Sequence, residues 1–160
     1  MIDFFHKGAE MTKKIQGVAK LKGAPVINSR PVRSIAKLVK FKDGEDVVAR
    51  VLLEVASTPE QRRRGLMGRK NLPSICGMLF EGLSGGGYFW MKDCLIPLDI
   101  VFLDKNGVIT KTYSMAVDKH GEKHYDYDSD DVAAIELKSG FCKKHGLSKG
   151  NKAVISAIRG

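Results

Sequence analysis

Cysteine is scarce in this chain, which holds three, Cys76, Cys94 and Cys142, among 160 residues. They form no Cys-x-x-Cys pair, and an odd number cannot all be joined within one chain. This usage excludes the disulfide-rich secreted scaffolds and is typical of proteins kept in a reducing compartment. The sequence therefore predicts a cytoplasmic protein.

Long apolar runs are also missing. No run reaches the roughly 18 residues that a membrane-spanning helix needs. Near the N-terminus, lysines interrupt the apolar segments every few positions, so the apolar core of a secretory signal does not form. We expect neither insertion into a membrane nor secretion.

Recognisable catalytic and metal-binding spacings are absent as well. No Ser/His/Asp or Cys/His arrangement is evident. Asp126, Asp128 and Asp130 have the spacing of a calcium loop, but its sixth position is Asp131 rather than Gly and its twelfth is Leu137 rather than Glu. We expect no metal and no cofactor, and a non-enzymatic role is favoured while catalysis stays open.

Positive charge is concentrated at the N-terminus. Of the net charge of +9, residues 1–42 carry +8 and residues 43–160 carry +1. Glycine and proline break the first segment, and apolar side chains are scattered through it. The pattern predicts a basic extended arm at 1–33 and a compact domain at 34–160. The basic side chains expected to bind a partner are Lys13, Lys14, Lys20, Lys22, Arg30 and Arg33.

Alternating and apolar segments predict a mainly β (α+β) domain, with a compact, barrel-like antiparallel sheet and one or two short helices. Asp43-Gly44 and the turn at 104–107 each have residues typical of a hairpin. Strands are expected at 34–42, 47–55, 98–103, 108–113, 133–137 and 153–158, and the polar segment 118–131 is expected to be a loop.

Two short segments have helix-start signals. Thr58 and Gln61 form a capping-box pattern with a proline between them at the first helical position, which predicts a helix from Thr58 to about Met67 that stops at Gly68. A second helix is expected at 139–146, with a serine as its N-cap and a glycine at its end.

Asp99 lies in the longest apolar run of the chain, within a segment whose residues are apolar on both faces of a strand. Burying an unpaired carboxylate costs several kcal/mol, so a cation or a set of backbone N–H groups should meet it. Lys92, Arg64 and Arg69 are the nearest cations in the sequence. On this residue alone, a structural pair is favoured over a catalytic role.

Several motifs resemble, in order and spacing, the uncharacterised family called domain of unknown function 192. They are RGLMGR at 64–69, GMLF at 77–80, FWMK at 89–92, PLDI at 97–100 and a closing segment with Glu136, Gly140 and 146–150. The likeness spans about residues 50–158. It implies a compact, predominantly β, barrel-like domain with one or two short helices, and it implies no established activity.

The motif residues define one candidate site. Arg69 and Asp99 would be polar anchors of a small-ligand pocket or an enzyme site beside Trp90, although Met and Trp residues are more often part of a core. The residues of this candidate cluster are Arg64, Met67, Arg69, Trp90, Lys92 and Asp99.

The basic arm leads to the favoured hypothesis on function. Such an arm suits docking of a small domain onto a larger protein assembly, such as a viral particle, either in the cytoplasm or within a particle assembled there. The second hypothesis is a nucleic-acid-binding accessory protein, because nucleic acid also attracts a basic arm. The third is the small-ligand or enzyme site around Arg69, Trp90 and Asp99.

Overall fold

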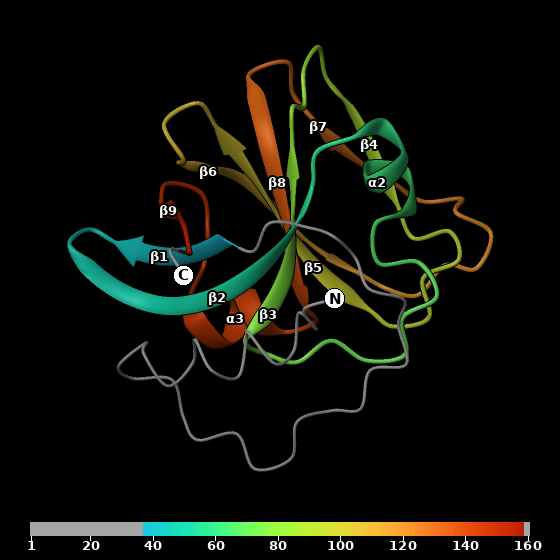
Figure 1. Ribbon diagram of the computed structural model, residues 1–160, viewed down its shortest axis with the longest axis horizontal. Helices are drawn as coiled ribbons and strands as arrows, with labels where there is room; N and C mark the ends of the chain where they lie inside the picture. The colour runs from blue at the N-terminus through green and yellow to red at the C-terminus, as the bar shows by residue number, and fades with distance from the viewer. Residues whose placement is uncertain (1–36, 159–160) are drawn as a thin grey trace. The chain divides into compact units, whose positions relative to one another are not determined.

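The computed structural model describes residues 37–158 (Figure 1). The predicted basic arm at 1–33, with its six candidate partner-binding cations, lies outside the described residues. Within the described part, the prediction of a mainly β domain with two short helices is confirmed. None of the helices in this part is long and apolar enough to cross a membrane.

Seven strands form one mixed sheet in the order β6-β5-β8-β3-β2-β1-β9. Their bounds are Lys37–Asp43 for β1, Asp46–Ala56 for β2, Cys76–Glu81 for β3, Leu98–Asp104 for β5, Ile109–Met115 for β6, Asp131–Lys138 for β8 and Lys152–Ala157 for β9. The two predicted hairpins are confirmed, since β1 pairs antiparallel with β2 and β5 with β6. Only the pair of β2 and β3 is parallel.

The sheet is not closed into a barrel. One isolated bridge, between Val108 and Lys152, connects the segment before β6 with β9 at the two outer edges of the sheet. The mainly β description of the domain therefore holds, but the predicted antiparallel sheet contains one parallel pair, and the strand pairing does not show barrel closure.

A separate two-stranded ribbon consists of β4, Gly87–Trp90, and β7, His124–Tyr127. The expectation of a loop throughout 118–131 is wrong at β7. Tyr125 is buried and Tyr127 half-buried, and both pack in the second core described below, while Asp126 between them and His124 before them are exposed. This alternation is the period of a strand, and the surrounding charged residues obscured it.

The helix α2, Pro59–Arg64, begins with the predicted capping box, in which Thr58 and Gln61 cap each other. It ends at Arg64 rather than near Met67, because Gly65 has φ 45° and ψ −130° and leaves the helical conformation.

The helix α3, Phe141–His145, ends at Gly146 as predicted, and this glycine has the left-handed conformation. Its N-cap is Gly140, which has no side chain to cap the helix, so the prediction of Ser139 at this position was wrong.

Apolar side chains pack on both faces of the large sheet. On β5, Val101 and Leu103 belong to one core and Ile100 and Phe102 to another, as alternation along a strand requires. The first core includes residues of α3, and the second includes β4, β7 and the turn after α2. In Figure 1, α2 lies beside β4 and β7, whereas α3 lies next to β2 and β3. The prediction that 98–103 is buried on both faces is confirmed.

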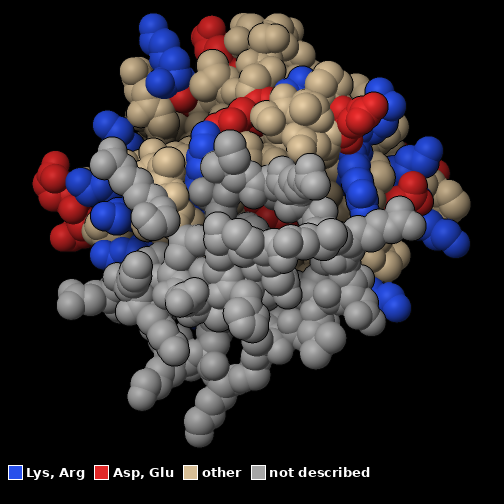
Figure 2. Space-filling view, viewed as in Figure 1, with Lys and Arg blue, Asp and Glu red and all other residues tan. Residues whose placement is uncertain are grey.

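The described surface carries both signs of charge. Figure 2 shows basic and acidic side chains next to one another on the visible part of the domain. This agrees with the nearly balanced charge of residues 43–160.

Candidate ligand-binding pocket

A pocket with a volume of about 340 Å³ opens beside α2. Its walls come from the end of α2 and the following turn, from β3, β4, β7 and β8, and from the loop after β4. Three arginines (Arg62, Arg63, Arg64) and five aromatic residues (Phe80, Tyr88, Phe89, Trp90, Tyr127) make up much of the lining. The remaining lining residues are Gly65, Leu66, Met67, Leu83, Cys94 and Glu136. This volume lies at the lower end of the range typical of small-molecule sites.

The aromatic wall of the pocket is held by ring-to-ring contacts. Phe89 meets Phe80 edge-on, with ring centroids 5.0 Å apart, and meets Tyr127 at 6.0 Å. At the open side, Tyr88 stacks on His124 at 3.8 Å. Tyr88 and Trp90 remain 50% and 37% exposed. The wall therefore combines a packed inner part with an outer part that offers apolar surface to a ligand.

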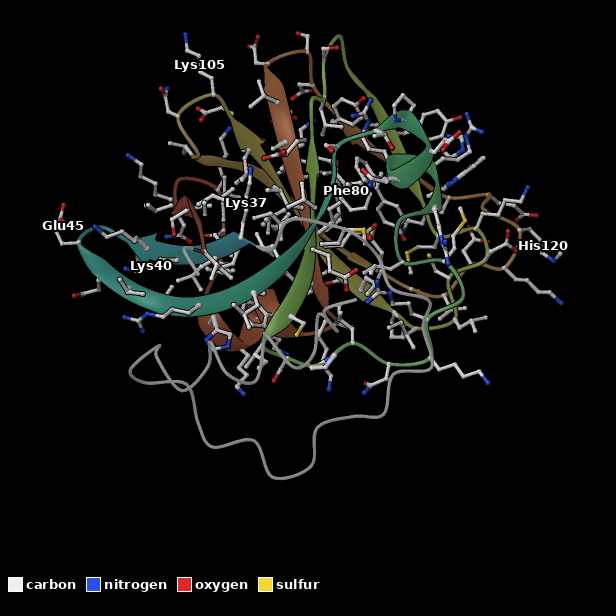
Figure 3. The ribbon with its side chains drawn as sticks, in the orientation of Figure 1. Lys37, Lys40, Glu45, Phe80, Lys105 and His120 are labelled. Carbon is white, nitrogen blue, oxygen red and sulfur yellow. The ribbon has the colours of Figure 1, made fainter. Side chains whose placement is uncertain are left out.

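The position of α2 over this wall depends on a few specific contacts. Arg62 donates hydrogen bonds from one guanidinium nitrogen to the carbonyl oxygens of Ser57, at 2.7 Å, and Glu81, at 2.9 Å. After the helix, Gly65 passes so close to Phe80 that an added Cβ would lie 3.3 Å from the ring. Figure 3 labels Phe80 next to α2. The helix end is thus fixed above β3, with Arg63 exposed beside it.

Glu136 lies at the buried end of the pocket. It is 4% exposed, and its atom Oε2 is buried without a hydrogen-bond partner among the described residues. Burial raises the pKa of this carboxyl to about 8, against the opposing charge of Arg69. At neutral pH the group is therefore mostly the neutral acid, which can donate one hydrogen bond.

Arg69 does not pair with Glu136, because Glu54 occupies it. The guanidinium donates two hydrogen bonds to the Glu54 carboxylate, at 2.6 and 2.5 Å. Both side chains are largely buried. This bidentate pair neutralises itself and leaves the carboxyl of Glu136 without a cation of its own.

The structure places four of the six candidate residues at or beside the pocket wall. Arg64, Met67 and Trp90 line it, and the Lys92 ammonium lies 5.6 Å from the centre of the Trp90 ring. Arg69, the fifth, acts on the pocket through its charge, which opposes the rise in the Glu136 pKa.

The expectation that Asp99 joins this cluster has to be corrected. Asp99 alternates with Ile100, which packs in the second core, and so points to the opposite face of the sheet. There its carboxylate accepts hydrogen bonds from the Ser114 hydroxyl, at 3.1 Å, and from the backbone N–H of Cys142 in α3, at 2.8 Å. Of the partners expected from the sequence, the backbone N–H is confirmed. The nearby cations are not the partners.

Sequence reasoning named Glu136 only as part of the closing motif and did not assign it to the candidate site, and it missed Glu54, the partner of Arg69. Both are buried acids whose neighbours in the strand are also buried, so an apolar residue would be expected at each position. The apolar residues around these two acids were the available signal that both are buried. Strand alternation alone, however, does not tell which of the two acids pairs with Arg69.

The pocket offers little for metal binding or nucleophilic chemistry. No group of three or more potential metal ligands comes together in residues 37–158. Burial raises the pKa of the Cys94 thiol to about 12, so the nucleophilic thiolate is not formed at neutral pH.

The fold is that of a small, mainly β domain. The family model for domain of unknown function 192, described as uncharacterized ACR, matches residues 39–155. The chain belongs to this family.

Two solved structures are similar to this chain. A protein of Sinorhizobium meliloti 1021, assigned provisionally as a transcription regulator, is 28% identical, with a TM-score of 0.73 over 81% of this chain and 100% of that one. A protein of unknown function from Novosphingobium aromaticivorans DSM 12444 is 25% identical, with a TM-score of 0.65 over 86% of this chain and 99% of that one. No curated protein sequence matches the chain.

Proposed function

We propose that the described domain is a binding module for a small organic molecule, which enters the pocket beside α2. The observation that carries this proposal is the carboxyl of Glu136, which lines the pocket, is 4% exposed and has a buried oxygen without a hydrogen-bond partner in residues 37–158. A buried polar group without a partner costs about 1–3 kcal/mol, and a ligand that hydrogen-bonds to it would recover part of that cost.

Binding is favoured over catalysis because the pocket has one acid and no activated nucleophile among its described lining residues. The Cys94 thiol stays protonated at neutral pH. Glu54, the other buried acid on this face, is held by Arg69 and is not part of the lining. General acid–base chemistry needs a positioned partner for the proton as well as a single carboxyl.

The only tryptophan of the chain, Trp90, lines the pocket and makes the test direct. With 8-anilinonaphthalene-1-sulfonate as the probe, we expect saturable quenching of Trp90 and energy transfer to the bound dye. Leu83→Phe, inside the pocket, should weaken binding by about tenfold because the larger ring fills the volume. Leu95→Phe is the matched control, since Leu95 is exposed and lies outside the lining. A titration without saturation, or equal effects of both substitutions, would contradict the proposal.

A second role is favoured by the charge of the N-terminal segment, +8 over residues 1–42. We propose that this segment docks the protein onto a larger cytoplasmic assembly, such as a particle formed there. Nucleic acid is the alternative partner, and the provisional assignment of the Sinorhizobium meliloti protein as a transcription regulator supports it.

Salt dependence separates these two partners. We would compare the full chain with a variant that lacks residues 1–33, using duplex DNA at about 50 to 200 mM salt. Docking onto a protein assembly predicts weak DNA binding that the deletion barely changes, whereas co-sedimentation with large particles is lost. Affinity for DNA that falls by orders of magnitude across this salt range, and is lost in the deletion variant, would favour nucleic acid instead.

A further inference from the structure

Resting on the proposed function of the pocket, we infer that its ligand is a small organic anion with an aromatic or branched apolar body. The anionic group lies at the mouth, beside the arginines at the end of α2. The apolar body lies along the aromatic wall, and a neutral hydrogen-bond acceptor at the inner end meets Glu136.

Positively charged side chains lie around the mouth of the pocket. Arg62, Arg63 and Arg64 all line the pocket, and none of them belongs to the four ion pairs found among residues 37–158. Arg62 is tied to carbonyl oxygens, which leave its charge uncompensated. The ammonium of Lys92 lies 5.6 Å from the centre of the ring of Trp90, a lining residue. Three arginines without an ion-pair partner among the described residues thus line the pocket, and their positive charge attracts an anion.

The buried end of the pocket lacks a compensating negative charge. Glu136 is the only acid among the described lining residues, and its raised pKa of about 8 keeps it mostly neutral at pH 7. The neighbouring acid Glu54 is neutralised by Arg69. A ligand therefore meets positive potential at the mouth and a neutral donor at the inner end, and only an anionic group gains from the first of these.

The aromatic wall determines the kind of body that fits. The inner rings of Phe80 and Phe89 are packed edge-on, and Tyr88 and Trp90 extend the wall outward as partly exposed rings. Flat or branched apolar groups pack well on such a surface. An organic amine could also use these rings, but it would have to pass the arginines and ionise a carboxyl that burial keeps protonated.

One set of probes with a common body isolates the charge of the ligand. We would titrate the full chain at about pH 7 with 3-phenylpropanoate, 3-phenylpropan-1-ol and 3-phenylpropan-1-amine, following Trp90 fluorescence and calorimetry. The expected order of affinity is acid, then alcohol, then amine, with about two- to fivefold between successive probes at low salt. If the amine binds most tightly, the inference of an anion is wrong while the proposed pocket stands. If the alcohol binds as tightly as the acid, charge does not contribute to binding and the inference of an anion also falls.

Variants assign the effect to the mouth and to the inner end. Arg63→Gln and Arg64→Gln should each weaken the acid by about two- to fivefold and leave the alcohol unchanged. Lys105→Gln removes the same charge from an exposed turn remote from α2, as Figure 3 shows, and should change neither affinity.

The inner contact is tested at Glu136. Glu136→Gln keeps a neutral donor and should bind 3-(4-acetylphenyl)propanoate, whose carbonyl reaches inward, as well as the unmodified protein does. Glu136→Leu should weaken that probe by about tenfold. Equal binding by both Glu136 variants would overturn the inner contact, and loss of affinity in Lys105→Gln would overturn the specific role of the mouth.

Discussion

Glu54 on β2 holds the guanidinium of Arg69 by two hydrogen bonds, at 2.6 and 2.5 Å, and thereby leaves Glu136 as the unpaired carboxyl on this face of the sheet. The same arginine still opposes the rise in the Glu136 pKa, so the two acids are coupled through it. The inner end of the pocket is neutral because Glu54 forms the ion pair with Arg69, whereas Glu136 stays protonated.

Removal of Arg69 should be strongly destabilising. In Arg69→Met the carboxylate of Glu54 loses its only described cation while it stays largely buried, and the free energy of unfolding should fall by about 3–5 kcal/mol. Urea denaturation measures this loss. The double variant Glu54→Leu/Arg69→Met should be more stable than the single variant, because it leaves no unpaired charge.

The ion pair between Lys37 and Glu81 supplies the control. Its side chains are 26% and 37% exposed, so Lys37→Met should cost less than about 1 kcal/mol. If Arg69→Met lowers the free energy of unfolding no more than Lys37→Met does, the buried pair of Glu54 and Arg69 contributes less to stability than its geometry indicates.

Asp99 should matter for stability and not for binding. Asp99→Ala removes the acceptor of both the Ser114 hydroxyl and the Cys142 N–H, and the free energy of unfolding should fall by about 3 kcal/mol. Ser114→Ala removes only one hydrogen bond and should cost about 1 kcal/mol. Binding of 3-phenylpropanoate, measured below the unfolding transition, should stay the same, because Asp99 points away from the pocket face. Unchanged stability together with lost binding would contradict this assignment.

Local signals in the sequence predicted the hairpins, the capping box at Thr58 and the doubly buried strand β5, since each depends on neighbouring residues. The ribbon of β4 and β7 could not be found in this way. Its partners lie more than thirty residues apart, and one of them is embedded in an acidic segment. Long-range packing, not propensity, makes it a strand.

For the candidate site as well, local motifs predicted some residues, and long-range strand pairing determines the others. Arg64, Met67, Trp90 and Asp99 were all drawn from motifs; the first three do line the pocket, whereas Asp99 does not. Strand alternation places it on the other face. Glu136 lies far along the chain from all of them, and only the pairing of β8 with β3 and β5 brings it to the pocket.

Glu136 gives the stability of the domain a specific pH dependence. Its pKa is about 8 in the folded state and 4.5 in the reference state. Below the reference value the acid is protonated in both states, and burial carries no penalty for charge. As pH rises from about 4.5 to 8, the unfolded state ionises and the folded state does not, so the free energy of unfolding falls.

The variant Glu136→Gln isolates this effect from other titrating groups. The stability of the unmodified protein minus that of the variant should fall by about 1.4 kcal/mol per pH unit in the middle of this window and level off above about pH 8. Urea denaturation of both proteins at several pH values measures the difference. Arg69 and the Cys94 thiol, the charged and titratable groups coupled to Glu136, are present in both proteins. A difference that does not change with pH would mean that Glu136 is already ionised in the folded protein.

The turn after α2 should couple the stability of the fold to the binding of the anion. Gly65 has φ 45° and ψ −130°, a conformation that residues with a side chain rarely adopt, and an added Cβ would lie 3.3 Å from the Phe80 ring. Gly65→Ala should therefore lower the free energy of unfolding by about 2 kcal/mol or more. Because Arg63 and Arg64 directly precede this turn, a change in its backbone should shift them, and binding of 3-phenylpropanoate should weaken more than binding of 3-phenylpropan-1-ol.

Gly68→Ala tests whether this effect belongs to Gly65 or to any glycine of the turn. Gly68 also has a left-handed φ, 74°, but an added Cβ would have no neighbour within 4 Å, and the residue lies outside the pocket lining. The substitution should cost about 1 kcal/mol from backbone strain alone and leave the ratio of the two affinities unchanged. Urea denaturation and Trp90 fluorescence titrations of the two variants give both quantities. If Gly68→Ala shifts the ratio as much as Gly65→Ala does, general loosening of the turn would explain the result, and the close contact between Gly65 and Phe80 would not be what orients the arginines.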